Sequence, residues 1–283
     1  MSKVDLHIHS VVSDGRLSPA DIVRTAAESG LAFIAIADHD IVDGIIPALE
    51  AARAFPALKV IPGVEISTDV PHGEVHVLGY FIDYTDRNLG ASLKRFRDSR
   101  LERAQKMIAK LKNFGINVEW PRVQEIAGAG SVGRPHIAQA MLEKGYITSI
   151  REAFAKYIGR EGPAYVEREK MTPVEAVELI VRAHGLAVLA HPFTTANLEA
   201  TVSELKAAGL AGLETYYDGY NTEQINRLLS LAKDHELIPT GGSDYHGLEA
   251  ATETAIGGVD VPIECARQLV MLAEKQGLKL AYQ

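Results

Sequence analysis

The segment Asp5-Leu6-His7-Ile8-His9-Ser10 is the most informative part of this 283-residue chain, because it combines a strand pattern with two metal-type side chains. We expect a strand over residues 3–9. Residues two apart in a strand point to the same face, so His7 and His9 would present both imidazoles to one ion. The apolar residues between them would face the opposite layer.

Short polar patches of the same kind recur along the chain, each at or near the end of an expected strand. They are Ser13-Asp14-Gly15, Asp38-His39, Gly63-Val64-Glu65, His76-Val77-Leu78-Gly79, His191-Pro192 and Ser243-Asp244-Tyr245-His246. Carboxylate oxygens and imidazole nitrogens are common ligands of divalent ions. Their number predicts a site with more than one ion, and such sites mostly hydrolyse phosphate or amide bonds.

Strands and helices alternate through most of the chain. We expect the further strands at residues 31–38, 59–67, 74–83, 186–190, 210–216, 237–241 and 255–261. Ser18-Pro19-Ala20-Asp21 and the capping box Thr172-Pro173-Val174-Glu175 each begin a helix. This alternation predicts an α/β fold with a parallel sheet closed, or nearly closed, into a barrel. Barrel enzymes build their sites from the loops that follow the strands, where these patches fall.

The region from residue 84 to residue 162 interrupts this alternation. A long helix over residues 89–114 and a second over residues 123–128 lead to Gly133-Arg134-Pro135-His136, where a third helix begins. We therefore expect a barrel formed by residues 1–83 and 163–283, with an all-helical insertion at 84–162 beside its mouth. We expect the basic face of the long helix, which includes Arg100 and Arg103, to be solvated, with steering of an anionic substrate as the alternative.

The composition limits the classes of partner. A formal net charge of −8 and a pI near 5.7 argue against binding long duplex nucleic acid. They allow a small phosphorylated substrate, because bound cations would reverse the local charge. Cys265 cannot form a disulfide within the chain, and no apolar run is long enough for a membrane helix. With no signal peptide recognised, we expect a cytoplasmic protein; the oligomeric state stays open.

The order and spacing of the patches resemble the PHP family, the polymerase and histidinol phosphatase metal hydrolases. The resemblance implies a distorted, TIM-like (β/α)7 barrel with two to three divalent ions, Mn first, with Fe, Mg or Zn as alternatives. The implied ligands are His7, His9, Glu65 and Asp244 for one ion, Glu65, His76 and His191 for a second, and Asp14, His39 and His246 for a third.

The helical insertion resembles one branch of that family, which removes the 3′-phosphate of nucleoside 3′,5′-bisphosphates or trims short RNA from its 5′ end. His191, Arg134 and Asp244 are the implied catalytic residues. Arg134 follows a glycine-rich loop at a helix start, a position suited to clamping a phosphate. The candidate substrate contacts are Arg134, His136, Arg160, Lys170 and Phe193, with Tyr165 and Tyr217 as weaker ones.

Three alternatives remain at this point. The chain would be a histidinol-phosphate-type phosphomonoesterase, an amidohydrolase that cleaves C–N bonds, or a non-catalytic module of a polymerase assembly. Two carboxylates also have two interpretations each. Asp5 would either orient a ligand histidine or close the strand start, and Asp38, beside His39, has the same choice.

Overall fold

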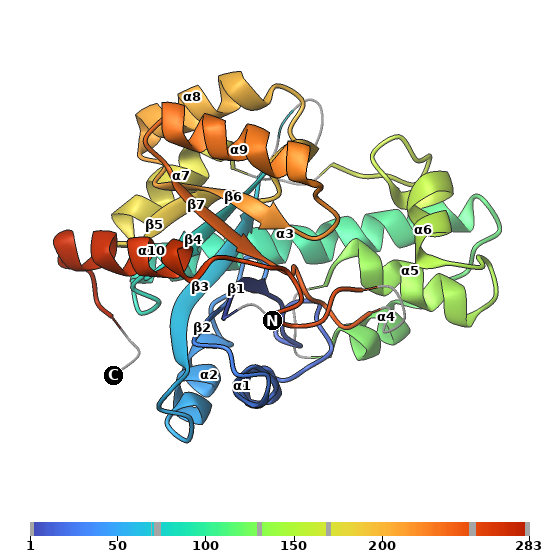
Figure 1. Ribbon diagram of the computed structural model, residues 1–283. Helices are drawn as coiled ribbons and strands as arrows, with labels where there is room; N and C mark the ends of the chain where they lie inside the picture. The colour runs from blue at the N-terminus through green and yellow to red at the C-terminus, as the bar shows by residue number, and fades with distance from the viewer. Residues whose placement is uncertain are drawn as a thin grey trace.

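The computed structural model describes residues 3–68, 70, 75–128, 132–167, 171–248 and 253–280. Seven strands form a single sheet whose spatial order follows their order in the sequence. They are β1 Val4–Ile8, β2 Phe33–Ile36, β3 Lys59–Ser67, β4 His76–Tyr80, β5 Leu186–Leu189, β6 Gly212–Tyr217 and β7 Ile238–Gly242 (Figure 1).

The sheet is nearly closed into a barrel. Ile8 of β1 forms a parallel bridge with Tyr245, just after β7, and the backbone N–H of His9 donates to the Tyr245 carbonyl at 2.9 Å. The expectation of an all-parallel sheet is wrong at one strand, because β4 runs antiparallel to both β3 and β5. Only residues 68–75 join β3 to β4, and so short a connection joins antiparallel neighbours but is too short for a parallel crossover.

A second expectation also fails, because residues 255–261 contain no strand. Ala255–Gly258 form a turn in which the Gly258 N–H donates to the Ala255 carbonyl at 2.7 Å. Gly257 has a φ of +75°, in the left-handed region that favours glycine. Its N–H donates to a carboxylate oxygen of Asp5 at 2.8 Å, which holds this turn against β1.

Helices cover the outside of the sheet. α1 (Pro19–Glu28) and α2 (Ile45–Ala52) lie beside β1 to β3, where Ile22 of α1 packs with Ile34 and Ile36 of β2. α10 (Ile263–Lys275) packs against β7 and β1. The expected capping residues are confirmed: Ser18 accepts from the Asp21 N–H at 3.1 Å, and Thr172 accepts from the Glu175 N–H at 3.2 Å.

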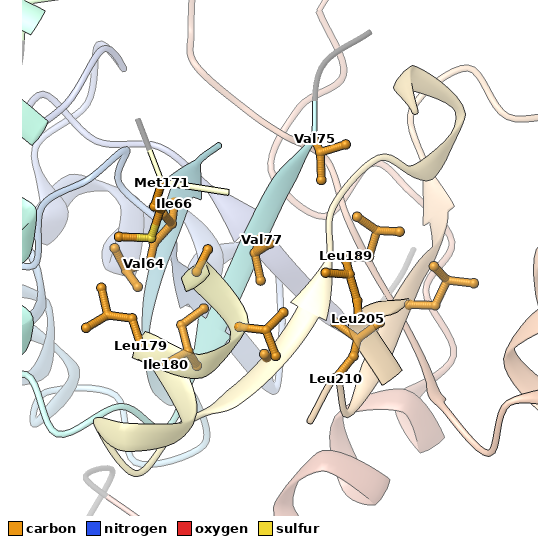
Figure 2. Close-up of a cluster of buried hydrophobic side chains, with 14 of the residues drawn as sticks. Val64, Ile66, Val75, Val77, Met171, Leu179, Ile180, Leu189, Leu205 and Leu210 are labelled. Carbon is orange, nitrogen blue, oxygen red and sulfur yellow. The ribbon is translucent and has the colours of Figure 1, made fainter. Parts of the chain in front are cut away.

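The largest apolar cluster lies between the strands and α7 (Pro173–Arg182), α8 (Leu198–Ala208) and α9 (Thr222–Asp234). Figure 2 shows Val64 and Ile66 of β3 beside Leu179 and Ile180 of α7. Because successive side chains in a strand alternate between faces, burying Val64 and Ile66 on the helix side turns Glu65 toward the other face.

A second group of helices extends to one side of the barrel (Figure 1). It comprises α3 (Arg87–Lys112), α4 (Trp120–Ala127), α5 (Arg134–Glu143), α6 (Ile150–Ala153) and the π-helical turn Phe154–Ile158. α3 belongs to two apolar clusters: Leu89, Leu93 and Phe96 lie in the barrel cluster, whereas Met107 and Leu111 lie in the cluster of the helical group. We propose residues 84–162 as an insertion, and this separate cluster supports the proposal.

Membrane-spanning segments are not found among the helices of the described residues, none of which combines the required length with sufficient apolar character.

Candidate metal centre

The nine ligand positions expected from the sequence gather at one end of the barrel. In a first group, the ligand atoms of His7, His9, Glu65 and Asp244 all lie within 4.8 Å of one another. The Nε2 atoms of His7 and His9 are 3.0 to 3.4 Å from Glu65 Oε2 and Asp244 Oδ1. Strands β1 and β3 and the loop after β7 therefore bring these four side chains to one point.

A second group contains Asp14, His39 and His246, with His9 as a fourth member. His246 Nε2 lies 3.5 Å from Asp14 Oδ1, and His39 Nε2 lies 3.9 Å from Asp14 Oδ2. His9 Nδ1 is 3.8 Å from Asp14 Oδ1, while its Nε2 belongs to the first group. His9 therefore adjoins both groups, although the family resemblance implied it for one ion alone.

Glu65 lies at the centre of a third group. Its Oε1 is 2.9 Å from His76 Nδ1 and 3.0 Å from His191 Nε2, and its Oε2 is 3.0 Å from His39 Nδ1. The position fits the bridging carboxylate that the resemblance implied. His39 also contacts Glu65 through Nδ1. The resemblance implied His39 only for the ion held by Asp14, which its Nε2 faces.

Two features of the backbone place these residues. His76 is the first residue of β4, so it lies at a strand's beginning, and the expectation that all patches follow strand ends is wrong here. Because β4 runs antiparallel, its beginning meets the carboxyl ends of β1, β2 and β3.

His191 and Asp244 have positive φ values of 27° and 53°, an uncommon conformation for residues with side chains. Such strain is frequently found at functional sites.

Asp38 holds the loop that carries Asp14. Its carboxylate accepts hydrogen bonds from Ser10 N, Ser10 Oγ and Ser13 Oγ, each at 2.7 Å. Asp38 therefore anchors this loop through these serines, a role that neither of the two interpretations from the sequence included.

Asp5 anchors the loop that carries Asp244 in the same way. It accepts from the Ser243 N–H at 2.9 Å and from the Ser243 hydroxyl at 2.7 Å. With the bond from Gly257, it ties two segments after β7 to the first strand. Asp5 therefore positions the backbone of a ligand residue, and its contact with His7 is to the backbone N–H at 3.3 Å.

Glu214 was missed in the sequence, and it is fully buried behind the centre. Its Oε1 lies 2.9 Å from His7 Nδ1, and its Oε2 accepts from the His191 N–H at 2.6 Å. A carboxylate at Nδ1 leaves the Nε2 lone pair of His7 directed at the cluster. Gly212-Leu213-Glu214 repeats the Gly-x-Glu pattern of Gly63-Val64-Glu65, and this repeat was the signal that could have revealed it.

Tyr217 takes a different place from the substrate contact considered for it. Its hydroxyl donates to Asp244 Oδ2 at 2.7 Å. Since Asp244 Oδ1 is the oxygen that faces His7 and His9, this hydrogen bond fixes which carboxylate oxygen faces the cluster.

The residues fit a set of cations. Of the seven buried side-chain atoms that have no hydrogen-bond partner among the described residues, five belong to the centre: His7 Nε2, both ring nitrogens of His9, Asp14 Oδ1 and Glu65 Oε2. Buried polar atoms left unpaired are costly, and here these five all point into one cluster. Two ligands that are each roughly 2.1 Å from one ion, at roughly 90° to 109°, lie about 3.0–3.4 Å apart. The distances of the first group match this separation.

The carboxylates of the centre stay ionised. Burial alone would raise the pKa of Glu65, but His39 and His76 outweigh it and hold the pKa well below its usual range. Burial is likewise outweighed at Asp244 by His7 and at Asp14 by His39, so both pKa values are lowered. Three carboxylates concentrated in a buried site attract divalent cations, which exchange with the protons of the neighbouring imidazoles.

A cavity of about 200 Å³ opens beside the centre. Its lining residues are Asp14, His39, Ser67, Thr68, His76, Arg100, Arg103, Arg134, Pro135, Phe154 and His246. Metal-type ligands and three arginines thus line one cavity. The expected solvated face of α3 is wrong for Arg100 and Arg103, because α3 packs along the barrel and carries them to its mouth.

Interactions with neighbouring groups position the three arginines. Arg100 Nε donates to Asp40 Oδ2 at 2.8 Å, and its Nη2 donates to the Ser67 hydroxyl at 2.7 Å. Arg103 donates to the Val166 carbonyl at 2.7 Å, and the Arg134 guanidinium lies 5.2 Å from the Phe154 ring centre. Burial, followed by the charges of Arg134 and Arg100, lowers the pKa of Arg103 to about 10. An anion bound beside Arg103 would reduce its repulsion with Arg134, whereas Arg100 is already ion-paired with Asp40.

The other expected substrate contacts lie elsewhere. Arg160 donates to the Val70 carbonyl, and Phe193 packs edge-to-face on Tyr220 with ring centres 5.0 Å apart; neither lines this cavity. His136 lines a neighbouring cavity, and its Nδ1 accepts from the Gly133 N–H at 3.0 Å. Lys170 lies outside the described residues.

A nearly closed barrel with imidazoles and carboxylates clustered at one end defines the class of metal-dependent hydrolases. The chain belongs to the PHP domain family, whose model matches residues 5–167.

Similar proteins agree with this class. The chain is 33% identical to a 3′,5′-nucleoside bisphosphate phosphatase of Chromobacterium violaceum over 258 residues, which are 87% of this chain and 88% of that protein. It is 35% identical to a 5′-3′ exoribonuclease of Escherichia coli over 248 residues, 86% of this chain and 84% of that one. A crystal structure from Bifidobacterium adolescentis, assigned to the metal-dependent phosphoesterases, matches with a TM-score of 0.87 at 29% identity, covering 95% of this chain and 96% of that one.

Proposed function

We propose that this enzyme removes the 3′-phosphate of nucleoside 3′,5′-bisphosphates and releases phosphate and the 5′-nucleotide. One observation carries the proposal: metal-type ligands and the side chains of Arg100, Arg103 and Arg134 line the same cavity. Such a cavity suits a substrate with two anionic groups. The phosphatase from C. violaceum, which matches over most of its length, supports the same substrate class.

The centre would hold two to three divalent ions, with Mn²⁺ expected first and Fe, Mg or Zn as alternatives. The proposed ligands are His7, His9, Asp14, His39, Glu65, His76, His191, Asp244 and His246. When bound, such ions neutralise phosphoryl oxygens and lower the pKa of a water molecule toward ~7.

The chain's own side chains orient these ligands and the substrate. Glu214 holds the imidazole of His7, and Tyr217 holds the carboxylate of Asp244. Arg134, with its two neighbours on α3, would bind the phosphate that is not cleaved. The His191 ring contacts Glu65 through Nε2 and Thr194 through Nδ1, which favours a ligand over the proton donor considered from the sequence.

The alternatives fit the cavity less well. A histidinol-phosphate-type substrate would bring an ammonium group toward three guanidiniums, and like charges repel. An amide substrate would make no use of these arginines. Short 5′-phosphorylated RNA is a second candidate, because its terminal phosphate would bind the same arginines, and the E. coli relative supports it. A cytoplasmic location remains our expectation from the single cysteine.

Hydrolysis by the Mn²⁺-loaded protein tests the proposal. We would compare adenosine 3′,5′-bisphosphate, adenosine 3′-phosphate, adenosine 5′-phosphate and histidinol phosphate. The bisphosphate should give the highest kcat/KM, because the arginines contact its second phosphate. A preference for histidinol phosphate would establish the alternative, and equal rates on the bisphosphate and adenosine 3′-phosphate would remove the role of the second phosphate. Turnover that survives chelation would refute the metal centre.

A further inference from the structure

A second and larger cavity, of about 510 Å³, adjoins the arginine-lined one. It lies between the loop after β1 and the end of α4. Its lining residues are Val11, Val12, Ser13, Asp14, Gly15, Arg16, Ile41, Asp43, Ile126, Ala127, Gly128, His136 and Leu248. The phosphate contacts proposed for a bisphosphate do not use the apolar walls of this cavity.

The two cavities meet at the metal-type ligands. Asp14 lines both. Three other segments pass from the first cavity to the second within two residues: His39 to Ile41, Pro135 to His136, and His246 to Leu248. Asp14, His39 and His246 belong to one ligand group, and all three line the arginine-lined cavity. A phosphate held at that group would therefore adjoin both the arginine-lined cavity and the larger one.

The walls of the two cavities differ in chemistry. The arginine-lined cavity is small and cationic, whereas the larger one is walled mainly by Val11, Val12, Ile41, Ile126 and Leu248. Val11 and Leu248 are 40% and 39% exposed, so the cavity presents apolar surface to a ligand. A volume of this size with apolar walls suits a ring-containing ligand such as a nucleoside.

His136 gives this cavity a polar group of defined character. Its Nδ1 accepts a hydrogen bond from the Gly133 N–H, so the neutral ring carries its proton on Nε2. Burial, which lowers the pKa of His136, keeps the ring neutral. A neutral donor beside apolar walls suits the hydroxyl groups and base edges of a nucleoside better than it suits a second phosphate.

We propose that the larger cavity binds the nucleoside esterified to the far side of the scissile phosphate, which is the second nucleotide of a 5′-phosphorylated oligonucleotide. This inference rests on the proposed function, since it takes the 5′-phosphate to lie at the arginines. Water adds to phosphorus and the P–O3′ bond breaks. The 3′ oxygen leaves with a proton, and the second nucleoside retains the phosphate on its 5′ oxygen. The same centre thus cleaves a diester as well as a monoester.

Three substrates with the same first nucleotide test the assignment on the Mn²⁺-loaded protein. They are adenosine 3′,5′-bisphosphate, its 3′-methyl ester and the dinucleotide pApA. The methyl ester and the dinucleotide are both diesters, so the ratio of their kcat/KM values isolates the second nucleoside. Removing apolar base surface from water is favourable, and for a base packed against apolar side chains we expect the dinucleotide to exceed the methyl ester by about 10-fold.

Cavity-filling substitutions test whether the second nucleoside binds in the larger cavity. Ile126→Trp fills the cavity from α4, and Val11→Trp fills it from the opposite wall in case the first variant folds poorly. Either should reduce the dinucleotide-to-methyl-ester ratio to near one. Ile46→Trp, on the exposed face of α2, is the matched control and should keep the wild-type ratio.

The outcomes separate this inference from the proposed function. A wild-type ratio near one, or a ratio unchanged in both cavity variants, overturns the cavity assignment even when the bisphosphate is a good substrate. A protein that cleaves pApA with the expected ratio but leaves the bisphosphate intact refutes the proposed phosphatase function and supports the cavity assignment.

Discussion

Replacing Arg134 with alanine would remove one of the three guanidiniums that face the metal-type ligands. A hydrogen bond to a charged group contributes about 1.5–3 kcal/mol, which is roughly 10- to 150-fold in a specificity constant. Arg100 and Arg103 would remain, and relief of the repulsion between Arg134 and Arg103 offsets part of the loss. We therefore expect the lower part of this range, about 10- to 40-fold, for a nucleoside 3′,5′-bisphosphate.

The assay compares kcat/KM for the bisphosphate and for an aryl phosphate, which has no second anion and should lose far less. Arg182→Ala is a matched control, because Arg182 is an exposed arginine that pairs with Glu178 on the outer face of α7. Bound Mn²⁺ is measured in each variant. An equal loss on both substrates would place Arg134 at the reacting phosphate, and no loss on either would make it a surface residue; both results refute its role at the second phosphate.

Three further predictions concern the ligands themselves. Glu214→Gln should weaken Mn²⁺ binding roughly 10- to 100-fold without unfolding the protein, because His7 loses its charged partner; an unchanged Mn²⁺ titration would remove Glu214 from the centre. Tyr217→Phe should lower kcat more than it lowers Mn²⁺ occupancy, since Asp244 keeps its place but loses the hydrogen bond that selects its ligand oxygen; wild-type kcat at full occupancy would contradict this. Burial alone would lower the pKa of His9, but Asp244 and Glu65 raise it to about 10, so the metal-free imidazole is protonated at pH 7. Binding of Mn²⁺ should then release at least about one proton per chain and tighten as pH rises from about 6 to 8, as calorimetry in buffers of different ionisation enthalpy would show.

The site could be predicted from the sequence to the extent that its residues occur in short local patterns. His7 and His9 share a strand face by simple alternation, and the structure places them together. The reverse direction of β4 does not follow from such alternation. It depends on the short connection at residues 68–75, which only an antiparallel neighbour allows.

The features that local sequence patterns did not predict depend on contacts between distant elements. Arg100 lies among many charges on a long helix, and only the packing of α3 against the barrel brings it to Asp40 and the cavity. The apolar pattern at residues 255–261 predicted a strand, but Gly257 adopts a left-handed conformation and its N–H is held by Asp5. Glu214 repeats a local pattern, yet its burial behind His7 depends on the closure of the barrel.

The length of α3 has a consequence for how this protein tolerates insertions and deletions. The helix has 26 residues, or about 39 Å at ~1.5 Å per residue, and it is anchored at both ends in different apolar clusters. The length of α3 therefore fixes the distance between the two clusters. One residue added between Phe96 and Arg100 would advance the second half by about 1.5 Å and turn it by about 100°, away from the cavity. Relatives that keep the arginine-lined cavity should therefore vary in the loops that follow α3, while the spacing between its apolar anchors and its arginines stays fixed.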